Sequence, residues 1–250
     1  MIAKSLRDHV YEANLSLVRH QLVSFTWGNA SGVDRQRGWM AIKPSGIDYS
    51  HLQPEDIVLV DLETGRVIDG TLRPSSDTPT HRFLYLAFDS IGGIVHTHSR
   101  HATVWAQSAL DIPCLGTTHA DYFHGPIPCT QPMDGDEIAD GYEHNTGVKI
   151  LQEFRDRGLD PLHMQAILVG GHGPFTWGPD ASGAVECAAV LEEVARMSWD
   201  TLLLNPRTQP IPSALLEKHF TRKHGPSAYY GQAGVTRPQI ALESASERAA

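Results

Sequence analysis

The feature that most constrains the fold is a short apolar segment that ends in two histidines. Residues 91–95 are Ile-Gly-Gly-Ile-Val, and His96 and His98 follow. An apolar run with β-branched residues predicts a buried strand. Because side chains alternate along a strand, imidazoles at positions i and i+2 project from the same side, close enough to share one metal ion. The segment therefore predicts half of a metal site at the end of a strand.

A second apolar run offers a third imidazole. Residues 166–169 predict another strand, and the turn residues of 170–174 (Gly-Gly-His-Gly-Pro) would end it and lift His172 off its tip. An isolated His-X-His pair is more often packed or solvated than metal-bound, and 14 histidines make chance pairings easier. The glycines beside His172 favour the metal, because glycine at a strand end commonly marks a close backbone approach. An oxygen ligand is still needed.

Helix and strand signals alternate along the chain. Apolar spacing predicts helices over residues 2–20, 136–157, 184–204 and 213–220, and another that starts near Thr78-Pro79 and ends before Gly92. Further strands are predicted over 39–42, 57–60 and 67–68, the last two joined as a hairpin. Without a linker or repeat, this alternation predicts one α/β domain over residues 1–232, with a mixed or antiparallel central sheet flanked by helices. The polar residues 233–250 are expected to form a loosely ordered tail.

Composition excludes several classes of function. The formal net charge of −9 and the lack of a Lys/Arg block argue against a nucleic-acid partner. Charged residues near the N-terminus argue against a secretory signal, and no apolar run approaches the ~20 residues of a membrane span. The three cysteines form no C-x-x-C pair, which favours a reducing cytosol. We therefore expect a cytoplasmic protein of 250 residues with a sizeable core.

Three segments combine the small and polar residues that can hold a phosphate. Residues 26–32 and 43–46 are glycine-bearing loops whose backbone N–H groups can point at one spot, and Lys43 adds a positive charge. Residues 73–77 lie at a predicted helix start, where unpaired N–H groups and the helix dipole favour an anion. Each segment by itself is also compatible with an ordinary turn or a helix cap, since none carries a nucleotide-binding fingerprint.

A series of short segments follows in a fixed order along the chain: LVSFTWGN (22–29), IKPSG (42–46), PSSDTPTH (74–81), GGIVHTHS (92–99), TTHADYF (117–123), HGPF (172–175), KHG (223–225) and YYGQ (229–232). Together these segments resemble the epimerase branch of the class II sugar-phosphate aldolase/epimerase family. The resemblance covers nearly everything before the tail, and it implies the class II aldolase type of fold. One departure is Gly170-Gly171, where relatives carry bulkier polar residues, and we expect it to loosen the turn.

The resemblance also implies roles for individual residues. Metal ligands would be Asp77, His96, His98 and His172, around one divalent ion per subunit, with Zn²⁺ expected and Mn²⁺ as the alternative. Phosphate would be bound by Asn29, Lys43, Ser45, Gly46, Ser75 and Ser76. Asp121 and Tyr230 would be the acid/base pair, in a homotetramer whose sites lie between subunits. From the residues alone, Asp121 fits a turn cap or a salt-bridge partner equally well, and Tyr230 fits a packing role. His119, His219 and Arg222 could also line the site.

The activity that the resemblance implies is interconversion of L-ribulose 5-phosphate and D-xylulose 5-phosphate. The C4 hydrogen of such a sugar is not adjacent to the carbonyl, so inversion is expected to proceed by retro-aldol cleavage of C3–C4, rotation of the aldehyde and re-addition. An aldolase of the same family is the first alternative, although Asp77 stands where the fuculose-phosphate type has a longer Glu. A metal-binding protein without enzymatic activity is the second, and it would leave the phosphate loops without purpose.

Overall fold

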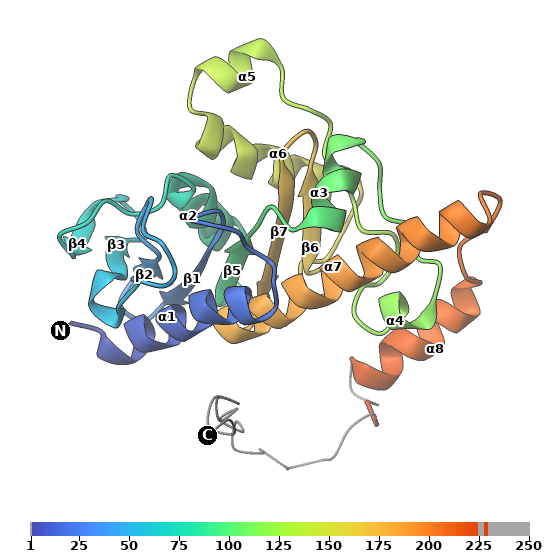
Figure 1. The fold of residues 1–250 in the computed structure, drawn as a ribbon, viewed down its shortest axis with the longest axis horizontal. Helices are drawn as coiled ribbons and strands as arrows, with labels where there is room; N and C mark the ends of the chain where they lie inside the picture. Colours follow the sequence, from blue (N-terminus) through green and yellow to red (C-terminus); the bar gives the residue numbers. More distant parts are fainter. Residues whose placement is uncertain (1, 225–227, 230–250) are drawn as a thin grey trace, which may run out of the picture.

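A seven-stranded sheet forms the centre of the molecule (Figure 1). The structure is a computed structural model that describes residues 2–224, 228 and 229. In this part of the chain the strand order is β4-β3-β2-β1-β5-β7-β6, and all neighbouring strands pair antiparallel. The strands are β1 (Asn29–Asp34), β2 (Trp39–Ile42), β3 (Val58–Asp61), β4 (Val67–Asp69), β5 (Gly93–His96), β6 (Ala166–Val169) and β7 (Gly173–Gly178). The predicted α/β class is confirmed, with the antiparallel form of the sheet.

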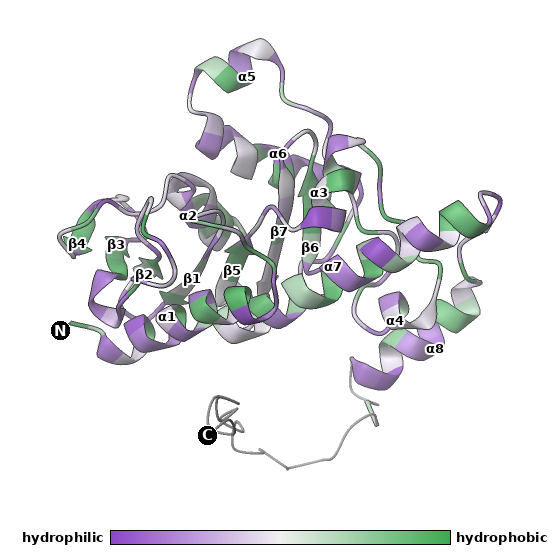
Figure 2. Cartoon of the chain, viewed as in Figure 1, coloured by the Kyte–Doolittle hydropathy of each residue, from purple (hydrophilic) through white to green (hydrophobic). Residues whose placement is uncertain are grey.

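Helices cover both faces of this sheet. The helices are α1 (Lys4–Arg19), α2 (Thr78–Ala87), α3 (Arg100–Gln107), α4 (Thr117–Ala120), α5 (Gly135–Ala139), α6 (Tyr142–Asp156), α7 (Ala181–Leu204) and α8 (Ser213–Lys223), with a 3-10 turn at Pro54–Asp56. Helix α1 and the first turns of α7 pack on one face, whereas α2 and α6 pack on the other. Both α1 and α7 alternate hydrophobic and hydrophilic residues along their length, as helices with one buried side do (Figure 2).

The alternation of side chains along the strands divides the core in two. In β2, Met40 and Ile42 join the cluster under α2 and α6, while Ala41 between them joins the cluster under α1 and α7. In β5, Ile94 and Val95 divide in the same way. Because both faces of these strands are buried, their sequences are continuous apolar runs and do not alternate between apolar and polar residues. This is why the apolar segments were correctly predicted as strands.

One predicted helix is wrong. Residues 136–157 were expected to form a single helix, but the chain forms α5 and α6 with a break between them. Helix α5 begins with a capping box in which Asp134 accepts from the backbone N–H of Glu137, and it ends at Ala139, because the next residue, Asp140, has a non-helical backbone. Gly141 then adopts the left-handed conformation (φ 81°), which glycine reaches at little cost, and α6 begins. The break sets the position of the first residues of α6.

Other elements were not predicted at all. Strands β1 and β7 and helices α3 and α4 lie in segments whose sequence predicts a loop or no regular element. The predicted helices and strands elsewhere are found within a few residues of their expected bounds. Among the described residues, none of the helices is both long enough and apolar enough for a membrane span. The expected tail at 233–250 and the end of the predicted domain at residue 232 lie outside the described residues, as does Tyr230.

Candidate metal centre and substrate cavity

The sheet brings the three predicted imidazoles together. His96 is the last residue of β5, His98 follows two residues later, and His172 stands in the turn between β6 and β7. Strand β7 pairs with β5, so this turn lies beside the end of β5. The Nε2 atoms of His96 and His98 are 3.2 Å apart, and one ring nitrogen from each of the three histidines lies within 4.8 Å of the others. In the described part of the chain this is the one cluster of metal-ligand side chains with such spacing.

Hydrogen bonding and burial prepare these imidazoles to act as ligands. The backbone carbonyl of Pro174 can only accept, so His96 Nδ1, 3.0 Å away, must carry a proton, and its Nε2 keeps a lone pair. Burial, reinforced by the neighbouring imidazoles, lowers the pKa of His172 to about 3 and lowers the pKa of His98 below its usual value. Neutral imidazole is the form that coordinates a metal, so the donor set fits a divalent ion.

Asp77 lies at the edge of this cluster. It occupies the residue before α2, but its side chain makes no capping hydrogen bond to that helix. Instead its Oδ2 accepts a hydrogen bond of 2.6 Å from Asn29 Nδ2, which also donates to Ser75 Oγ at 3.0 Å. Burial by itself would raise the pKa of Asp77, but the imidazoles of His96 and His81 and the bond from Asn29 lower it below the usual value. The carboxylate is therefore directed into the site and does not cap the helix.

The imidazoles open onto a cavity of about 520 Å³ that is also lined by the predicted phosphate loops. The loops after β2 and before α2 run side by side, because Ser45 N–H donates to Arg73 O and Ser75 N–H donates to Lys43 O. All six predicted phosphate residues lie on the wall of this cavity: Asn29, Lys43, Ser45, Gly46, Ser75 and Ser76. Segments that are each compatible with ordinary turns therefore meet at one place, next to the imidazoles.

Lys43 is the main positive charge of this wall. The residue is only 1% exposed, and its Nζ lies 4.7 Å from the centre of the Tyr49 ring. The ammonium donates one long hydrogen bond of 3.4 Å, to the carbonyl of Pro44. Burial lowers the pKa of Lys43 to about 8. A bound phosphate would supply the opposite charge that favours the protonated form.

Two residues of the cavity were not predicted from the sequence. They are Tyr142 and Glu143, the first two residues of α6, whereas Thr26 and Trp27, which also line the cavity, belong to the predicted loop 26–32. Tyr142 Oη lies 3.1 Å from His172 Nδ1. The signal that could have found Tyr142 is Gly141, since a glycine inside a helical pattern marks a possible break. The turn that carries His172 is not loosened by its glycines: Gly170 N–H donates to Thr130 Oγ1, and Gly171 N–H donates to the backbone of α3.

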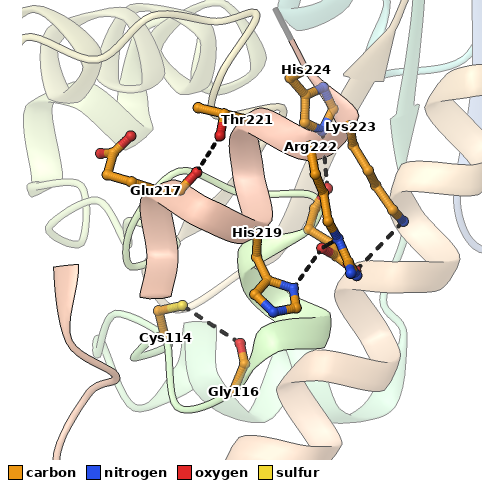
Figure 3. A network of polar contacts seen from close by, with 9 residues as sticks. Cys114, Gly116, Glu217, His219, Thr221, Arg222, Lys223 and His224 are labelled. Atoms are coloured by element: carbon orange, nitrogen blue, oxygen red, sulfur yellow. Dashed lines mark hydrogen bonds and ion pairs between the residues drawn. The ribbon is translucent and has the colours of Figure 1, made fainter. Parts of the chain in front are cut away.

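Asp121 is not among the residues that line this cavity. It follows α4 and is held by side chains of α8, which converge as Figure 3 shows. Its carboxylate accepts from Arg222 Nε and Nη2 at 2.9 and 2.6 Å and from His219 Nδ1 at 3.0 Å, and Lys223 Nζ lies 3.8 Å away. Burial opposes ionisation, but the bonds from Arg222 and His219 lower the pKa of Asp121 below its usual value. The salt-bridge alternative therefore describes Asp121 in this chain.

The other residues that were expected near the site also lie outside the cavity or outside the described residues. His219 and Arg222 belong to the Asp121 cluster, made of Asp121, His219, Arg222 and Lys223. His119 is buried, and its Nε2 donates to the carbonyl of Gly125 rather than facing the cavity. Burial lowers the pKa of His119 to about 4, so it is neutral at physiological pH. Tyr230 lies outside the described residues.

Comparison with known proteins gives the class to which this fold and site belong. The family model of the class II aldolase and adducin N-terminal domain matches residues 8–199. The chain therefore belongs to this family, and the resemblance found in the motifs is confirmed. The L-ribulose-5-phosphate 4-epimerase UlaF of Salmonella paratyphi B is 52% identical to it over 229 residues, which are 92% of this chain and 99% of that protein.

Solved structures show the same fold. An L-fuculose 1-phosphate aldolase superposes with a TM-score of 0.74 at 23% identity, covering 89% of this chain and 97% of its own. The L-fuculose-1-phosphate aldolase of Thermus thermophilus superposes with a TM-score of 0.64 at 23% identity, covering 82% of this chain and 98% of its own. At this level of identity the comparison concerns the fold and not the substrate.

Proposed function

We propose that the protein is an L-ribulose-5-phosphate 4-epimerase, which interconverts L-ribulose 5-phosphate and D-xylulose 5-phosphate. The observation that carries the proposal is the meeting of the His96, His98 and His172 cluster with the Lys43 and Ser75 loops in one cavity. A metal cluster alone would suit many proteins, whereas a neighbouring anion site calls for a phosphorylated substrate. The 52% identity to an L-ribulose-5-phosphate 4-epimerase supports this choice of sugar.

In this proposal the three histidines hold a divalent metal, and Asp77 ligates it or orients its ligands. Three neutral nitrogen ligands suit Zn²⁺, and the nearby carboxylate would also accept Mn²⁺. Such an ion, when bound, stabilises negative charge that develops on substrate oxygens as the C3–C4 bond breaks. Asn29 maintains the position of Asp77 through the 2.6 Å hydrogen bond between their side chains.

Lys43, Ser45, Gly46, Ser75 and Ser76, with Asn29, would hold the phosphate. Binding of the phosphate would keep the substrate in position in the cavity while the aldehyde formed by cleavage rotates. The buried ammonium of Lys43 is suited to the task, because a bound phosphate would place an opposite charge beside it where little water screens the attraction.

Asp121 and Tyr230 would carry the protons. One of them accepts the proton of the C4 hydroxyl as C3–C4 breaks, and the bonding electron pair remains on the C3 fragment. After the aldehyde has rotated, C3–C4 forms again and the other residue returns a proton to the new C4 oxygen. The lowered pKa of Asp121 keeps it ionised and able to accept a proton at neutral pH. Because Asp121 does not line the cavity of its own chain, we propose that it serves a second copy in a homotetramer.

The test is turnover by the metal-loaded protein. Protein dialysed against Zn²⁺ is incubated with L-ribulose 5-phosphate, and D-xylulose 5-phosphate and free glycolaldehyde are assayed separately. Epimerase activity predicts D-xylulose 5-phosphate without accumulation of glycolaldehyde. Accumulation of free aldehyde would indicate an aldolase of the same family instead, and no change in the sugar despite bound metal would contradict both enzymatic proposals.

Lys43→Met is expected to weaken the preference for the phosphorylated sugar. Methionine keeps most of the buried volume and removes the charge, and a hydrogen bond to a charged group contributes about 1.5–3 kcal/mol. For L-ribulose 5-phosphate we expect KM to rise and kcat to fall, with a loss in kcat/KM of roughly 10- to 100-fold, because distant binding energy also positions the reacting end. Steady-state kinetics with L-ribulose 5-phosphate and with unphosphorylated L-ribulose would measure it. Equal kcat/KM for the two sugars in the parent protein would contradict the phosphate site.

A further inference from the structure

The three imidazoles of the proposed metal centre are held in different ways. His96 donates from Nδ1 to the backbone carbonyl of Pro174, which β7 keeps in place. His172 stands in the turn after Gly171, which has a left-handed backbone (φ 74°), and its Nδ1 lies 3.1 Å from Tyr142 Oη. The ring of His172 is thus oriented by a side chain from another element. This side chain belongs to Tyr142, the first residue of α6, so its position depends on where α6 begins.

The direction of this hydrogen bond decides whether His172 can bind a metal through Nε2. A neutral imidazole carries one proton. If Nδ1 holds that proton and donates it to Tyr142 Oη, Nε2 keeps its lone pair for a metal. If the phenol donates to Nδ1 instead, Nε2 carries the proton and cannot coordinate. Only the first arrangement is compatible with a ligand, and it uses the phenol oxygen as an acceptor.

The start of α6 is anchored so that Tyr142 reaches this position. The break at Asp140 and Gly141 makes Tyr142 the first residue of α6. The hydroxyl of Thr80, on α2, donates to the carbonyl of Glu143. One helical turn further along α6, Gly147 lies against the ring of Phe83, where a Cβ would be only 2.9 Å from a ring carbon. Helix α2, which begins directly after Asp77, therefore also sets the position of Tyr142.

We propose that Tyr142 is a positioning residue that holds His172 in the metal-binding tautomer and orientation. The inference rests on the proposed metal centre. Side chains that hydrogen-bond to a ligand histidine fix its ring, and their loss typically costs 10- to 100-fold in metal affinity. Tyr142 is only half-buried and lines the cavity, and replacing it with Phe removes the phenol oxygen while keeping the aromatic ring.

The test compares Tyr142→Phe with the parent protein by zinc binding and not by activity alone. The Kd for Zn²⁺ is measured by competition with a chelator of known affinity, and we expect it to rise by about 10- to 100-fold in the variant. In the zinc-free proteins, nitrogen NMR of the histidine rings should show His172 protonated at Nδ1 in the parent and a mixture of tautomers in the variant. Tyr122→Phe is the matched control, because its hydroxyl contacts Glu186 at 3.4 Å instead of a histidine.

The outcomes separate this inference from the metal centre itself. A parent protein that binds no zinc would overturn both. A parent that binds zinc, with the same Kd and the same His172 tautomer in Tyr142→Phe, would overturn only the role of Tyr142. Circular dichroism of the variant guards against unfolding. The tautomer measurement stays decisive even if zinc binding refolds a loosened site.

Discussion

The double substitution of His96→Asn and His98→Asn is expected to abolish zinc binding and to stop turnover, while the fold is retained. The two Nε2 atoms lie 3.2 Å apart, so both substitutions remove nitrogen ligands from the same point. Metal stabilisation of oxygen charge contributes several kcal/mol, so kcat should fall by about 10³-fold or more. Metal analysis after dialysis and kinetics with L-ribulose 5-phosphate would measure both effects.

His144→Asn is a suitable control for this double variant. His144 is exposed on α6, where its ring packs edge-on against Phe83, and it is not part of the imidazole cluster. It should keep full zinc occupancy and the parent rate. Full occupancy and an undiminished rate in the double variant would exclude these histidines as ligands.

Asp121→Asn is expected to lower kcat by roughly 10²- to 10⁴-fold, the usual contribution of a general acid or base. The amide keeps the shape of the carboxylate but cannot take up a proton. It also weakens the pairing with Arg222 and Lys223, so some loss of stability is expected alongside. Zinc content should be unchanged, because Asp121 does not line the cavity of its chain.

Asp111→Asn separates the catalytic effect from the structural one. Asp111 forms a comparable two-point pair with Arg157 at another place on the molecule. Both variants should therefore show a similar drop in melting temperature, and only Asp121→Asn should lose turnover. If the two variants retain equal activity, Asp121 is a structural ion-pair partner and another residue must carry the proton.

Apolar periodicity predicted those helices and strands whose apolar side chains pack in the hydrophobic core. The strand at 166–169 and the long helix α7 follow directly from their hydrophobic patterns. Strand β1 was missed because its residues, Asn-Ala-Ser-Gly-Val-Asp, resemble a loop. It is nevertheless buried, since Ser31 pairs with His81 at 2.7 Å and with Tyr85 at 2.9 Å. Tertiary hydrogen bonds that no local pattern reveals thus stabilise a polar strand in the middle of the sheet.

The same limit applies to the site. Spacing along a strand predicted that His96 and His98 would meet, because two residues fix that geometry locally. Tyr142 could not be found in this way, since its contact with His172 joins positions 30 residues apart and depends on the break before α6. For Asp121, the motif indicated a role, but only the structure shows that α8 surrounds its carboxylate.

The three histidines and Asp121 lie in separate parts of one chain, and the proposed assembly would join the cavity of one copy to the Asp121 cluster of another. Chains with a defective cavity still carry an intact Asp121 cluster, and chains with a defective cluster still carry an intact cavity. In a mixed oligomer, some sites would then combine an intact cavity from one chain with an intact Asp121 cluster from another. Loss-of-function changes in this protein would accordingly fall into two complementation groups, and a chain defective in one half could still contribute to activity beside a chain defective in the other.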